Sequence, residues 1–354
     1  MIKKNYVSID LGNGYFKVVE GIGSKSEINI SNMFMFQIDE TIFNNGYIVD
    51  RNKFMEIIKS RLMPKIKSRN LLITLNSSDI TIRNITLPNG SDEELKQMLR
   101  FEMEELLPID FNNYVLDFRK VRDIETSNTI EKRVEVQGAV VPNRIPKELF
   151  ECFSELGFKP LSFNVNNASG FKLLNDVFSD IDYSKKYYTL DIGTRYLGFN
   201  VIDDSNMIFN RIIDLSSFNF GENLMKQFNL SKEELIYKLI NSIDLRRYTL
   251  YYDKVDPNIE YDMEFEKIVV GYVNQVNDEL QKTTKYYKTK ENSVEVDGII
   301  IYGGNSVIKG IREYIINYFN YDVITYDTYK NIKGFDNNYE FVAFVNAIGN
   351  LIKR

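Results

Sequence analysis

Two short segments of this 354-residue chain carry an aspartate that is closely followed by glycine. The first, SIDLGNGYFKVV, contains Asp10, and the second, TLDIGTRYLGFNVI, contains Asp191. Both follow the order apolar, aspartate, apolar, glycine, polar, and each links one predicted strand to the next. Such a turn can bind phosphate through main-chain amides, and the aspartate beside it can hold a cation. The pattern therefore predicts binding of a phosphate group together with a metal ion.

The first turn supplies several groups that suit an anion. Gly12 and Gly14 allow the backbone to take positive φ and to approach an anion closely. The amides of Asn13 and Tyr15 can then point at phosphate oxygens, and Lys17 adds a positive charge. We expect all five residues to bind nucleotide.

The second turn is expected to act from the opposite side of the same cleft. Asp191, Gly193 and Thr194 occupy positions that correspond to the first turn. Carboxylates bind Mg²⁺ while the ion keeps several of its water ligands. Asp10 and Asp191 are therefore expected to hold Mg²⁺, through water, against the phosphates.

A third segment, IIIYGGNS, places Gly303, Gly304 and Asn305 after a buried strand. The missing side chains leave room for a flat ring against the main chain. Any one glycine turn is a common hairpin, but three in this order are far more specific for a nucleotide. The sequence GxxxxGK[ST] is absent and the first turn lacks GxGxxG, so the site is neither a P-loop nor a dinucleotide fingerprint.

The composition excludes several other classes of function. With no histidine and one cysteine, Cys152, the chain has no internal disulfide, no usual transition-metal ligand set and no histidine-activated nucleophile. Cys152 lies in an apolar helical pattern and is predicted to be a core residue. The net charge of −6, with Lys and Arg dispersed among acids, argues against nucleic acid as the partner. No apolar stretch has signal-peptide or membrane-span length, which predicts a cytoplasmic protein.

The elements that position the turns belong to an α/β protein. The length suits two domains, or one two-lobed protein with a cleft. YVSIDLG, YFKVVEG, NLLITLN and DITIRNITLP are predicted strands, and RNKFMEIIKSRLMPKI has helical spacing. A second α/β unit opens with YYTLDIGTRYLGFNVI and continues through helices such as SKEELIYKLIN, where Ser231 and Glu234 form a capping box.

Between these units, about residues 88–160 look like a compact insertion. It opens with SDEELKQMLRFEMEELLP, a predicted helix with Ser91 and Glu94 as a capping box and Pro108 as its stop. Its strands are YVLDFRKVRDI and KRVEVQGAVVP, and a helix, IPKELFECFSELG, ends at Gly157. The first helix carries an apolar stripe formed by Leu95, Leu99, Met103 and Leu106.

The three turns resemble the phosphate 1, phosphate 2 and adenosine motifs of the actin, Hsp70 and sugar kinase superfamily. Within it the chain resembles the PilM family of type IV pilus assembly proteins, relatives of the cell-division actin FtsA. The segments that carry this resemblance are EELLPIDFNNYVLDF, GAVVPNRIPKELFECFSELGFKP, FNLSKEEL and FVNAIGNLIKR. The likeness extends along essentially the whole chain and is strongest at residues 81–117 and at the two aspartate turns.

The resemblance implies a two-lobed actin-like (ribonuclease H-like) ATPase fold with subdomains 1A, 1C, 2A and 2B. We expect 1A at 1–87 and 161–186, and 1C at 88–160. We expect 2A at 187–217 and 293–334, and 2B at 218–292. Residues 335–354 are expected to form a helix that packs on 1A. The ligands implied are ATP and Mg²⁺.

The resemblance also implies partners at the cytoplasmic face of the inner membrane. PilM proteins bind the cytoplasmic N-terminal tail of the membrane protein PilN in a groove between 1A and 1C, and other platform proteins of the pilus lie nearby. Contact with the membrane is then indirect. We expect Leu95, Leu99, Met103 and Leu106 to help form this groove, while the alternative is that their stripe is the core of 1C.

Two departures from the family bear on hydrolysis. Where PilM proteins usually carry acidic residues near the attacking water, this chain has Asn164 and Asn166 in FNVNNASG. An amide can hold a water molecule but cannot accept its proton as a carboxylate does. Ser216 and Ser217 replace a usual Gly-Gly beside the nucleotide. The expectation is therefore nucleotide binding with weak or absent hydrolysis.

Two other functions stay open on the sequence. A sugar-kinase-type phosphotransferase needs a catalytic carboxylate in the cleft, and none follows the strand LSFNV convincingly. A filament-forming homologue similar to FtsA or ParM would self-associate, but no sequence signature supports this, and the chain ends directly after its presumed last helix.

Overall fold

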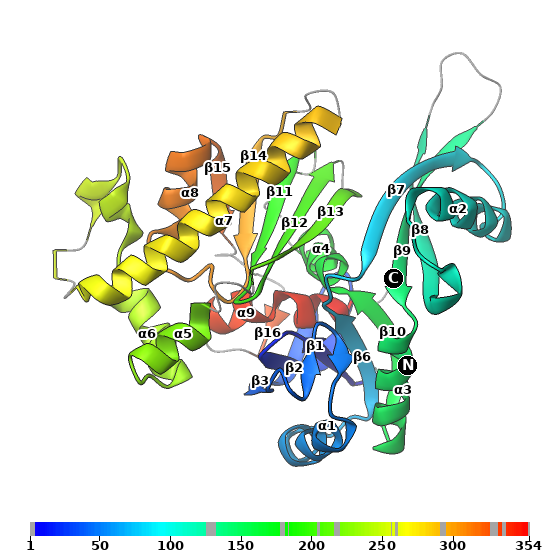
Figure 1. Cartoon of the computed structure of the whole chain (residues 1–354), viewed down its shortest axis with the longest axis horizontal. Coiled ribbons are helices and arrows are strands. Elements are labelled where there is room, and N and C mark those ends of the chain that lie inside the picture. Colours follow the sequence, from blue (N-terminus) through cyan, green and yellow to red (C-terminus); the bar gives the residue numbers. More distant parts are fainter. Residues whose placement is uncertain are drawn as a thin grey trace.

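The computed structural model describes most of the chain in two lobes and an insertion (Figure 1). The described residues are 4–124, 132–177, 181–182, 184–203, 206–215, 220–255, 257–258, 261–290, 295–325, 332–334 and 338–352.

The first lobe is built on a six-stranded sheet with the order β10-β6-β1-β2-β3-β16. β1 pairs antiparallel with β2 and parallel with β6, so the strand that carries Asp10 near its end lies inside the sheet. The six strands are β1 (Tyr6–Leu11), β2 (Tyr15–Gly23), β3 (Ile28–Gln37), β6 (Asn70–Leu75), β10 (Lys159–Val165) and β16 (Ile332–Lys333).

Helices α1 (Arg51–Ile57) and α3 (Arg144–Glu155) pack on this sheet. α1 continues through a π-helical turn, Ile58–Leu62, and a 3-10 turn, Met63–Lys65, as the helical spacing of this segment predicts. Cys152 of α3 is fully buried in the same core, which confirms its prediction as a core residue. A small hairpin of β4 (Phe43–Asn44) and β5 (Tyr47–Ile48) lies between β3 and α1 along the chain.

The insertion is a three-stranded antiparallel sheet, β7-β9-β8, with α2 (Asp92–Leu106) packed against it. Its strands are β7 (Thr81–Pro88), β8 (Tyr114–Ile124) and β9 (Arg133–Pro142), and a 3-10 turn, Phe111–Asn113, precedes β8. The capping box of Ser91 and Glu94 is present, and α2 ends before Pro108 as predicted.

The insertion begins and ends earlier than the boundaries that the sequence suggested, residues 88 and 160. β7 pairs with β9 along its whole length, so it belongs to the insertion sheet although it starts at Thr81. α3 follows β9 directly, but its apolar face packs in the first-lobe core. The reason is that β7 supplies the edge that β9 needs, whereas the buried residues of α3 pack mainly in the first-lobe core, where Ile82 of β7 and Ala139 and Val141 of β9 also meet them.

The second lobe has a five-stranded sheet with the order β13-β12-β11-β14-β15. Its strands are β11 (Tyr187–Ile192), β12 (Tyr196–Asp203), β13 (Asn206–Asp214), β14 (Gly298–Tyr302) and β15 (Asp322–Thr325). The helices of this lobe are α5 (Phe220–Gln227), α6 (Lys232–Asn241), α7 (Met263–Lys290) and α8 (Ile311–Phe319), with 3-10 turns at Leu245–Tyr248 and Tyr252–Lys254. The predicted capping box of Ser231 and Glu234 starts α6.

Two helices lie between the sheets of the two lobes (Figure 1). These are α4 (Asn166–Val177) and α9 (Asn338–Asn350), which contact each other extensively. α9 packs on β1, β2 and β6 of the first lobe and also contacts β14 of the second. β16 joins the first-lobe sheet beside β3, although its position in the sequence suggested the second lobe. The chain thus crosses between the lobes more than once.

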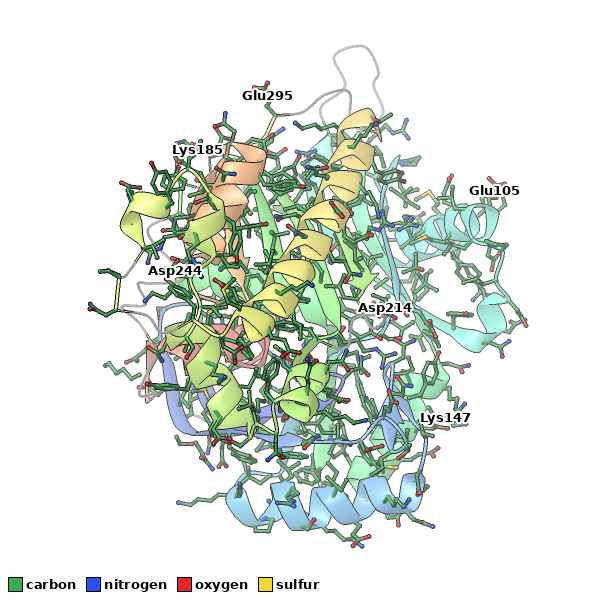
Figure 2. All side chains as sticks on the ribbon, turned by 60° about the vertical axis from the view of Figure 1, so that its left-hand side comes forward. Glu105, Lys147, Lys185, Asp214, Asp244 and Glu295 are labelled. Atoms are coloured by element: carbon green, nitrogen blue, oxygen red, sulfur yellow. The ribbon has the colours of Figure 1, made fainter. Side chains whose placement is uncertain are left out.

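Charged side chains cover the outer faces of the helices, as at Glu105 of α2 and Lys147 of α3, which are both exposed (Figure 2). Among the helices that the structure describes, none combines the length and the apolar composition of a membrane span.

Candidate functional site

The first turn joins β1 to β2, which place Asp10 opposite Lys17. Lys17 Nζ lies 3.8 Å from Asp10 Oδ2. Gly14 has a φ of +84°, and a Cβ on Gly12 would lie 2.9 Å from the carbonyl oxygen of Tyr15. Because side chains at these two positions would strain or block the turn, the glycines are required by its backbone.

The second turn joins β11 to β12 and repeats the close backbone approach found at Gly12. A Cβ on Gly193 would lie 2.8 Å from the carbonyl oxygen of Tyr196, and the Gly193 amide donates to the same oxygen at 3.1 Å. Asp191 at the end of β11 is buried, and its Oδ2 accepts a hydrogen bond of 2.6 Å from Asn346 Nδ2 of α9. The likeness that the sequence suggested is therefore a likeness of backbone conformation.

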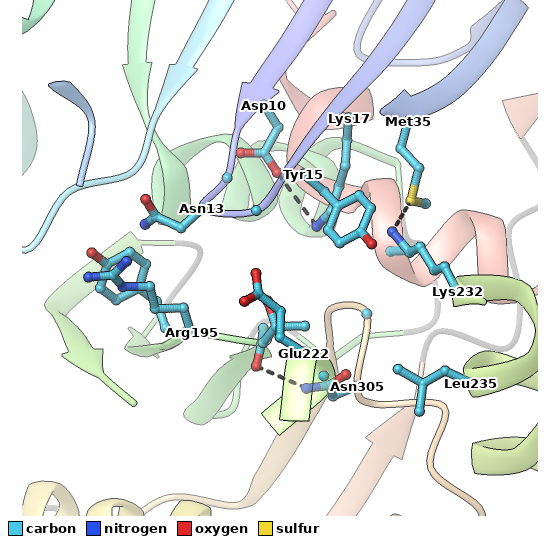
Figure 3. Close-up of a pocket in the computed structure, with 18 of the residues that line it drawn as sticks. Asp10, Asn13, Tyr15, Lys17, Met35, Arg195, Glu222, Lys232, Leu235 and Asn305 are labelled. Carbon is cyan, nitrogen blue, oxygen red and sulfur yellow. Dashed lines mark hydrogen bonds and ion pairs between the residues drawn. The ribbon is translucent and has the colours of Figure 1, made fainter. Parts of the chain in front are cut away.

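Both turns line one cleft between the lobes (Figure 3). Burial raises the pKa of Asp10 to about 6; Lys17 opposes this shift, and the charge of Asp191 adds to it. The two carboxylates therefore lie close enough to interact electrostatically. The other predicted residues of these turns that line the cleft are Gly12, Asn13, Gly14, Tyr15, Lys17, Gly193 and Thr194.

The third turn follows β14 and reaches the cleft through Gly304 and Asn305. Open space surrounds the position of a Cβ on Gly304. Asn305 Nδ2 donates to the Gly193 carbonyl at 3.1 Å and lies 2.9 Å from the Tyr272 hydroxyl, so this side chain braces the second turn.

Gly303 was expected to leave room for a nucleotide ring, but it lies against β11 instead. It has a φ of +96° and faces the Asp191 carboxylate and the Ile192 backbone, where a Cβ would clash. Its missing side chain therefore lets the third turn approach β11, and Gly303 is not among the described residues that line the cleft.

Several residues of the cleft were not anticipated from the sequence. α5 and α6 close one side of it with Glu222 and with a set of apolar side chains, namely Met225, Leu235, Ile236 and Leu239. Their spacing is that of any amphipathic helix, which is why it did not mark them. Other residues that line the cleft are Met35, Glu40, Asn76, Arg195 and Tyr196.

Lys232, the first residue of α6, reaches across the cleft to the first lobe (Figure 3). Its ammonium lies 3.1 Å from the centre of the Tyr15 ring and within hydrogen-bond distance of Met35 Sδ. Burial, together with the charge of Lys17, lowers the pKa of Lys232 to about 7. The cleft thus holds a lysine whose charge a bound anion can control.

Two buried oxygen atoms in the cleft lack hydrogen-bond donors among the described residues. They are Asp10 Oδ1 and Asn76 Oδ1. An unpaired buried oxygen is costly unless a ligand or water satisfies it. A hydrated cation or a hydroxyl-bearing ligand supplies the missing donors, so these residues fit a magnesium nucleotide. Among the residues described, no group of three or more acidic, cysteine or histidine side chains gathers to hold a metal by itself.

Asn164, one of the two residues expected to position water, lies elsewhere. Asn164 is on β10, where its Nδ2 donates to Asn350 Oδ1 at 2.5 Å and its Oδ1 accepts from Lys172 Nζ at 3.3 Å. It is not among the described residues that line the cleft. The side chain of Asn166, and Ser216 and Ser217 entirely, fall outside the described residues.

The apolar stripe of α2 requires a correction. Leu95, Leu99 and Met103 are fully buried against the insertion sheet, so they form its core and cannot line a groove for a partner. The reason is close packing: a Cβ on Gly138 of β9 would lie 2.9 Å from both Leu99 Cδ2 and Met103 Cε. Only Leu106, 58% exposed, is available at the surface.

Comparison with known proteins agrees with this geometry. The sequence matches the family described as Type IV pilus assembly protein PilM over residues 8–341. No curated protein sequence matches the chain significantly.

Among solved structures, the PilM-PilN type IV pilus biogenesis complex is similar with a TM-score of 0.76 and 17% identity, over 99% of this chain and 98% of that chain. The ethanolamine utilization protein EutJ from Carboxydothermus hydrogenoformans has a TM-score of 0.54 and 11% identity, over 99% and 90%. MreB 5 of Spiroplasma citri, bound to AMPPNP, has a TM-score of 0.50 and 10% identity, over 99% and 95%. These similarities show the actin-like ATPase fold that the three turns led us to expect. The chain therefore belongs to the type IV pilus assembly protein PilM family.

Proposed function

We propose that this protein binds ATP with Mg²⁺ in the cleft and, in response, binds the cytoplasmic tail of a PilN-like membrane protein. The observation that carries the nucleotide part is the pairing of the two aspartate turns. They come from separate lobes and line one cleft, with two carboxylates close enough to interact. A relative of this fold, MreB 5, is bound to AMPPNP.

The turns would hold the triphosphate from both sides. The amides of Asn13 and Tyr15 and the ammonium of Lys17 face it from the first lobe, and Thr194 faces it from the second. Asp10 and Asp191 would hold the hydrated Mg²⁺, whose charge offsets that of the phosphates.

The other end of the cleft suits a nucleoside. The side chains of Met225, Leu235 and Leu239 give an apolar surface for the base. Glu222, which also lines the cleft, can accept hydrogen bonds from ribose hydroxyls.

We propose that hydrolysis is weak or absent. Asn164, the residue expected to position water, is not among the described residues that line the cleft, and its amide contacts Asn350 and Lys172 instead. An amide also cannot take a proton from water as a carboxylate does. The bound nucleotide would then act chiefly by favouring the closed arrangement of the lobes, to the extent that it binds this state more tightly.

The partner proposal rests on the family and on exposed apolar side chains. The similar solved structure is a complex of PilM with PilN. Exposed apolar residues occur on four elements of the first lobe and the insertion, namely Phe101 and Leu106 of α2, Val115 of β8, Phe150 of α3 and Leu161 of β10. We propose that the tail of a PilN-like protein covers some of these, which would recruit the protein to the cytoplasmic face of the inner membrane beside other platform proteins.

Isothermal titration calorimetry with ATP, in the presence and absence of Mg²⁺, tests the nucleotide proposal. The wild-type protein should bind ATP more tightly with Mg²⁺. Asp10→Asn should lower the affinity at least about tenfold, because a carboxylate ligand is lost. Asp322→Asn, an equivalent change at an exposed position of β15, should leave it unchanged. Equal binding by Asp10→Asn and wild type would contradict the proposed site.

A further inference from the structure

The hairpin of β4 and β5 touches both phosphate-facing turns. Its two connecting residues, Asn45 and Gly46, have φ values of +50° and +87°. Two consecutive left-handed residues form a type I′ turn, for which Asn-Gly is the preferred pair. The Asn-Gly pair in FNNGYI thus predicts the hairpin locally, but nothing near it in the sequence shows what it contacts.

Asn45 contacts a turn from each lobe. Its main-chain amide donates to Asn13 Oδ1 of the first turn at 2.8 Å. Its side-chain Oδ1 accepts a hydrogen bond of 2.8 Å from the hydroxyl of Tyr196, which follows the second turn. Burial raises the pKa of Tyr196 to about 12, so this hydroxyl is a donor at neutral pH. One residue therefore joins the first lobe to the second at the edge of the cleft.

The same side chain extends the contacts away from the cleft. Asn45 Oδ1 also accepts from the Ser78 amide at 2.9 Å, and Asn45 Nδ2 donates to Asp79 Oδ1 at 3.2 Å. The other oxygen of Asp79 accepts a 2.8 Å hydrogen bond from the Tyr47 hydroxyl. The Asn45 side-chain oxygen thus accepts hydrogen bonds from both the Tyr196 hydroxyl and the Ser78 amide, and its nitrogen donates to Asp79. These bonds fix the position of the side chain.

The network ends at the start of α3. The Arg144 guanidinium lies over the Tyr47 ring, with its carbon 5.6 Å from the ring centre. A Cβ on Gly46 would lie 3.3 Å from Ile145 Cδ1, so the hairpin packs directly on this helix. α3 follows β9 of the insertion, and Asn143 before it donates its amide to the Asn113 carbonyl of the insertion at 2.9 Å. The N-terminal end of α3, which we call its base, is therefore where the first lobe and the insertion meet.

We infer that Asn45 is a positioning residue that links occupancy of the cleft to the base of α3. A ligand that draws Asn13 and Tyr196 toward itself moves two of the groups that hold Asn45. A shift of Asn45 would in turn displace Asp79 and Tyr47, to which it is linked by hydrogen bonds, and so displace the start of α3. This end of α3 lies at the junction that borders the proposed partner surface. This inference rests on the proposed function, because the ligand that it invokes is the nucleotide.

The test compares hydrogen exchange with and without AMPPNP and Mg²⁺ in the wild type and in Asn45→Gly. Glycine keeps the left-handed conformation and the main-chain donor to Asn13, but removes the amide that contacts Tyr196, Ser78 and Asp79. In the wild type, AMPPNP should slow exchange in residues 10–17, 191–196 and 144–155. In Asn45→Gly the two turns should still respond, whereas the response of 144–155 should fall at least about fivefold, the lower end of ordinary allosteric coupling.

Two further variants make the result specific. Asn320→Gly is the same change at another left-handed residue, the C-cap of α8, and should behave as the wild type. Tyr47→Phe removes only the hydroxyl that donates to Asp79, and should also reduce the response of 144–155.

The outcomes separate the two proposals. An undiminished α3 response in both Asn45→Gly and Tyr47→Phe would overturn the role of Asn45 while leaving nucleotide binding intact. If AMPPNP protects neither turn in the wild type, nucleotide binding itself fails, and the coupling fails with it.

Discussion

At the scale of single residues, Asp10 shows how a binding group can oppose stability. Its carboxylate is buried, and burial raises its pKa from 3.8 to about 6. The folded protein therefore binds more protons than the unfolded chain between about pH 4 and pH 6, and its free energy of unfolding falls as pH rises through this range. A shift of this size corresponds to about 3 kcal/mol of cost once the carboxylate is ionised. A cation in the cleft would relieve that cost.

Asp10→Asn should consequently stabilise the protein in the absence of ligand. The neutral amide has nearly the same shape and no ionisation cost, so at pH 8 its free energy of unfolding should exceed that of the wild type by up to about 3 kcal/mol. The difference should shrink toward zero near pH 4, where the wild-type carboxyl is protonated. Urea unfolding without Mg²⁺ at several pH values measures this. A variant that is less stable than wild type at pH 8 would show that Asp10 has favourable partners in the free protein.

Lys232 gives a second prediction at this scale. Its pKa of about 7 means that the side chain is mostly neutral at pH 8 in the free protein. A bound triphosphate favours the ammonium and raises this pKa, so ATP binding at pH 8 should take up a proton. At pH 6, where the ammonium is already present, Lys232 should contribute little uptake.

Calorimetry in two buffers of different ionisation enthalpy counts these protons. Lys232→Met should abolish the uptake at pH 8, whereas Lys226→Met, an exposed lysine of the neighbouring α5, should not. Identical binding enthalpies in both buffers for the wild type at pH 8 would refute the prediction.

At the scale of elements, α2 has two faces with separate tasks. Leu99 is fully buried against the insertion sheet, while Phe101 and Leu106 are 61% and 58% exposed. Leu99→Ala should destabilise the insertion by about 2–5 kcal/mol, through lost burial and the cavity left behind. Chemical denaturation followed by hydrogen exchange in residues 81–142 measures the loss.

The exposed face of α2 should respond in the opposite way. Phe101→Ser combined with Leu106→Ser should change the unfolding free energy by less than about 0.5 kcal/mol, because both side chains are already in solvent. The same variant should weaken binding of a PilN-tail peptide at least about fivefold if the tail covers this face. Ser substitution of Tyr252, a 70% exposed residue of the second lobe, is the matched control. If the α2 variant keeps full affinity for the peptide, α2 does not bind the tail, and the exposed residues of α3 and β10 become the candidates.

At the scale of the whole molecule, the insertion rests on the edge of the second-lobe sheet. Gln137 of β9 is buried, and its Nε2 donates to the Met207 carbonyl of β13 and to Asn84 Oδ1, each at 2.9 Å. Arg122 of β8 adds an ion pair, with its Nη1 3.6 Å from Asp203 Oδ2. The insertion therefore touches both lobes. A change in the angle between the lobes should alter the contacts of the insertion with the second lobe.

Gln137→Met should loosen this contact. The variant keeps the volume of the side chain but leaves buried hydrogen-bonding groups unpaired, which costs about 1–3 kcal/mol. Hydrogen exchange of residues 206–214 should accelerate accordingly. Gln281→Met, on the exposed side of α7, should leave exchange there unchanged. Unaltered exchange in the Gln137 variant would show that the insertion does not depend on the second lobe.

The parts of this protein that the sequence determined are those set by neighbouring residues. The two aspartate turns need glycine because their own backbones pass within contact distance of residues three positions later, and the capping boxes at Ser91 and Ser231 close over three residues. The family resemblance likewise rests on local segments, such as EELLPIDFNNYVLDF and FVNAIGNLIKR, and the family match over residues 8–341 agrees with it.

Only the tertiary structure decided which side chains face the cleft. Lys232 meets Tyr15 across more than 200 positions of sequence, and Asn45 meets Tyr196 across 151 positions. The stripe of α2 carried the same ambiguity, since apolar spacing on a helix is identical for a core and for a docking surface. The physical reason is that helical and strand patterns indicate which face of an element is buried, but not which residues it is buried against. Those contacts are set by the packing of the whole chain.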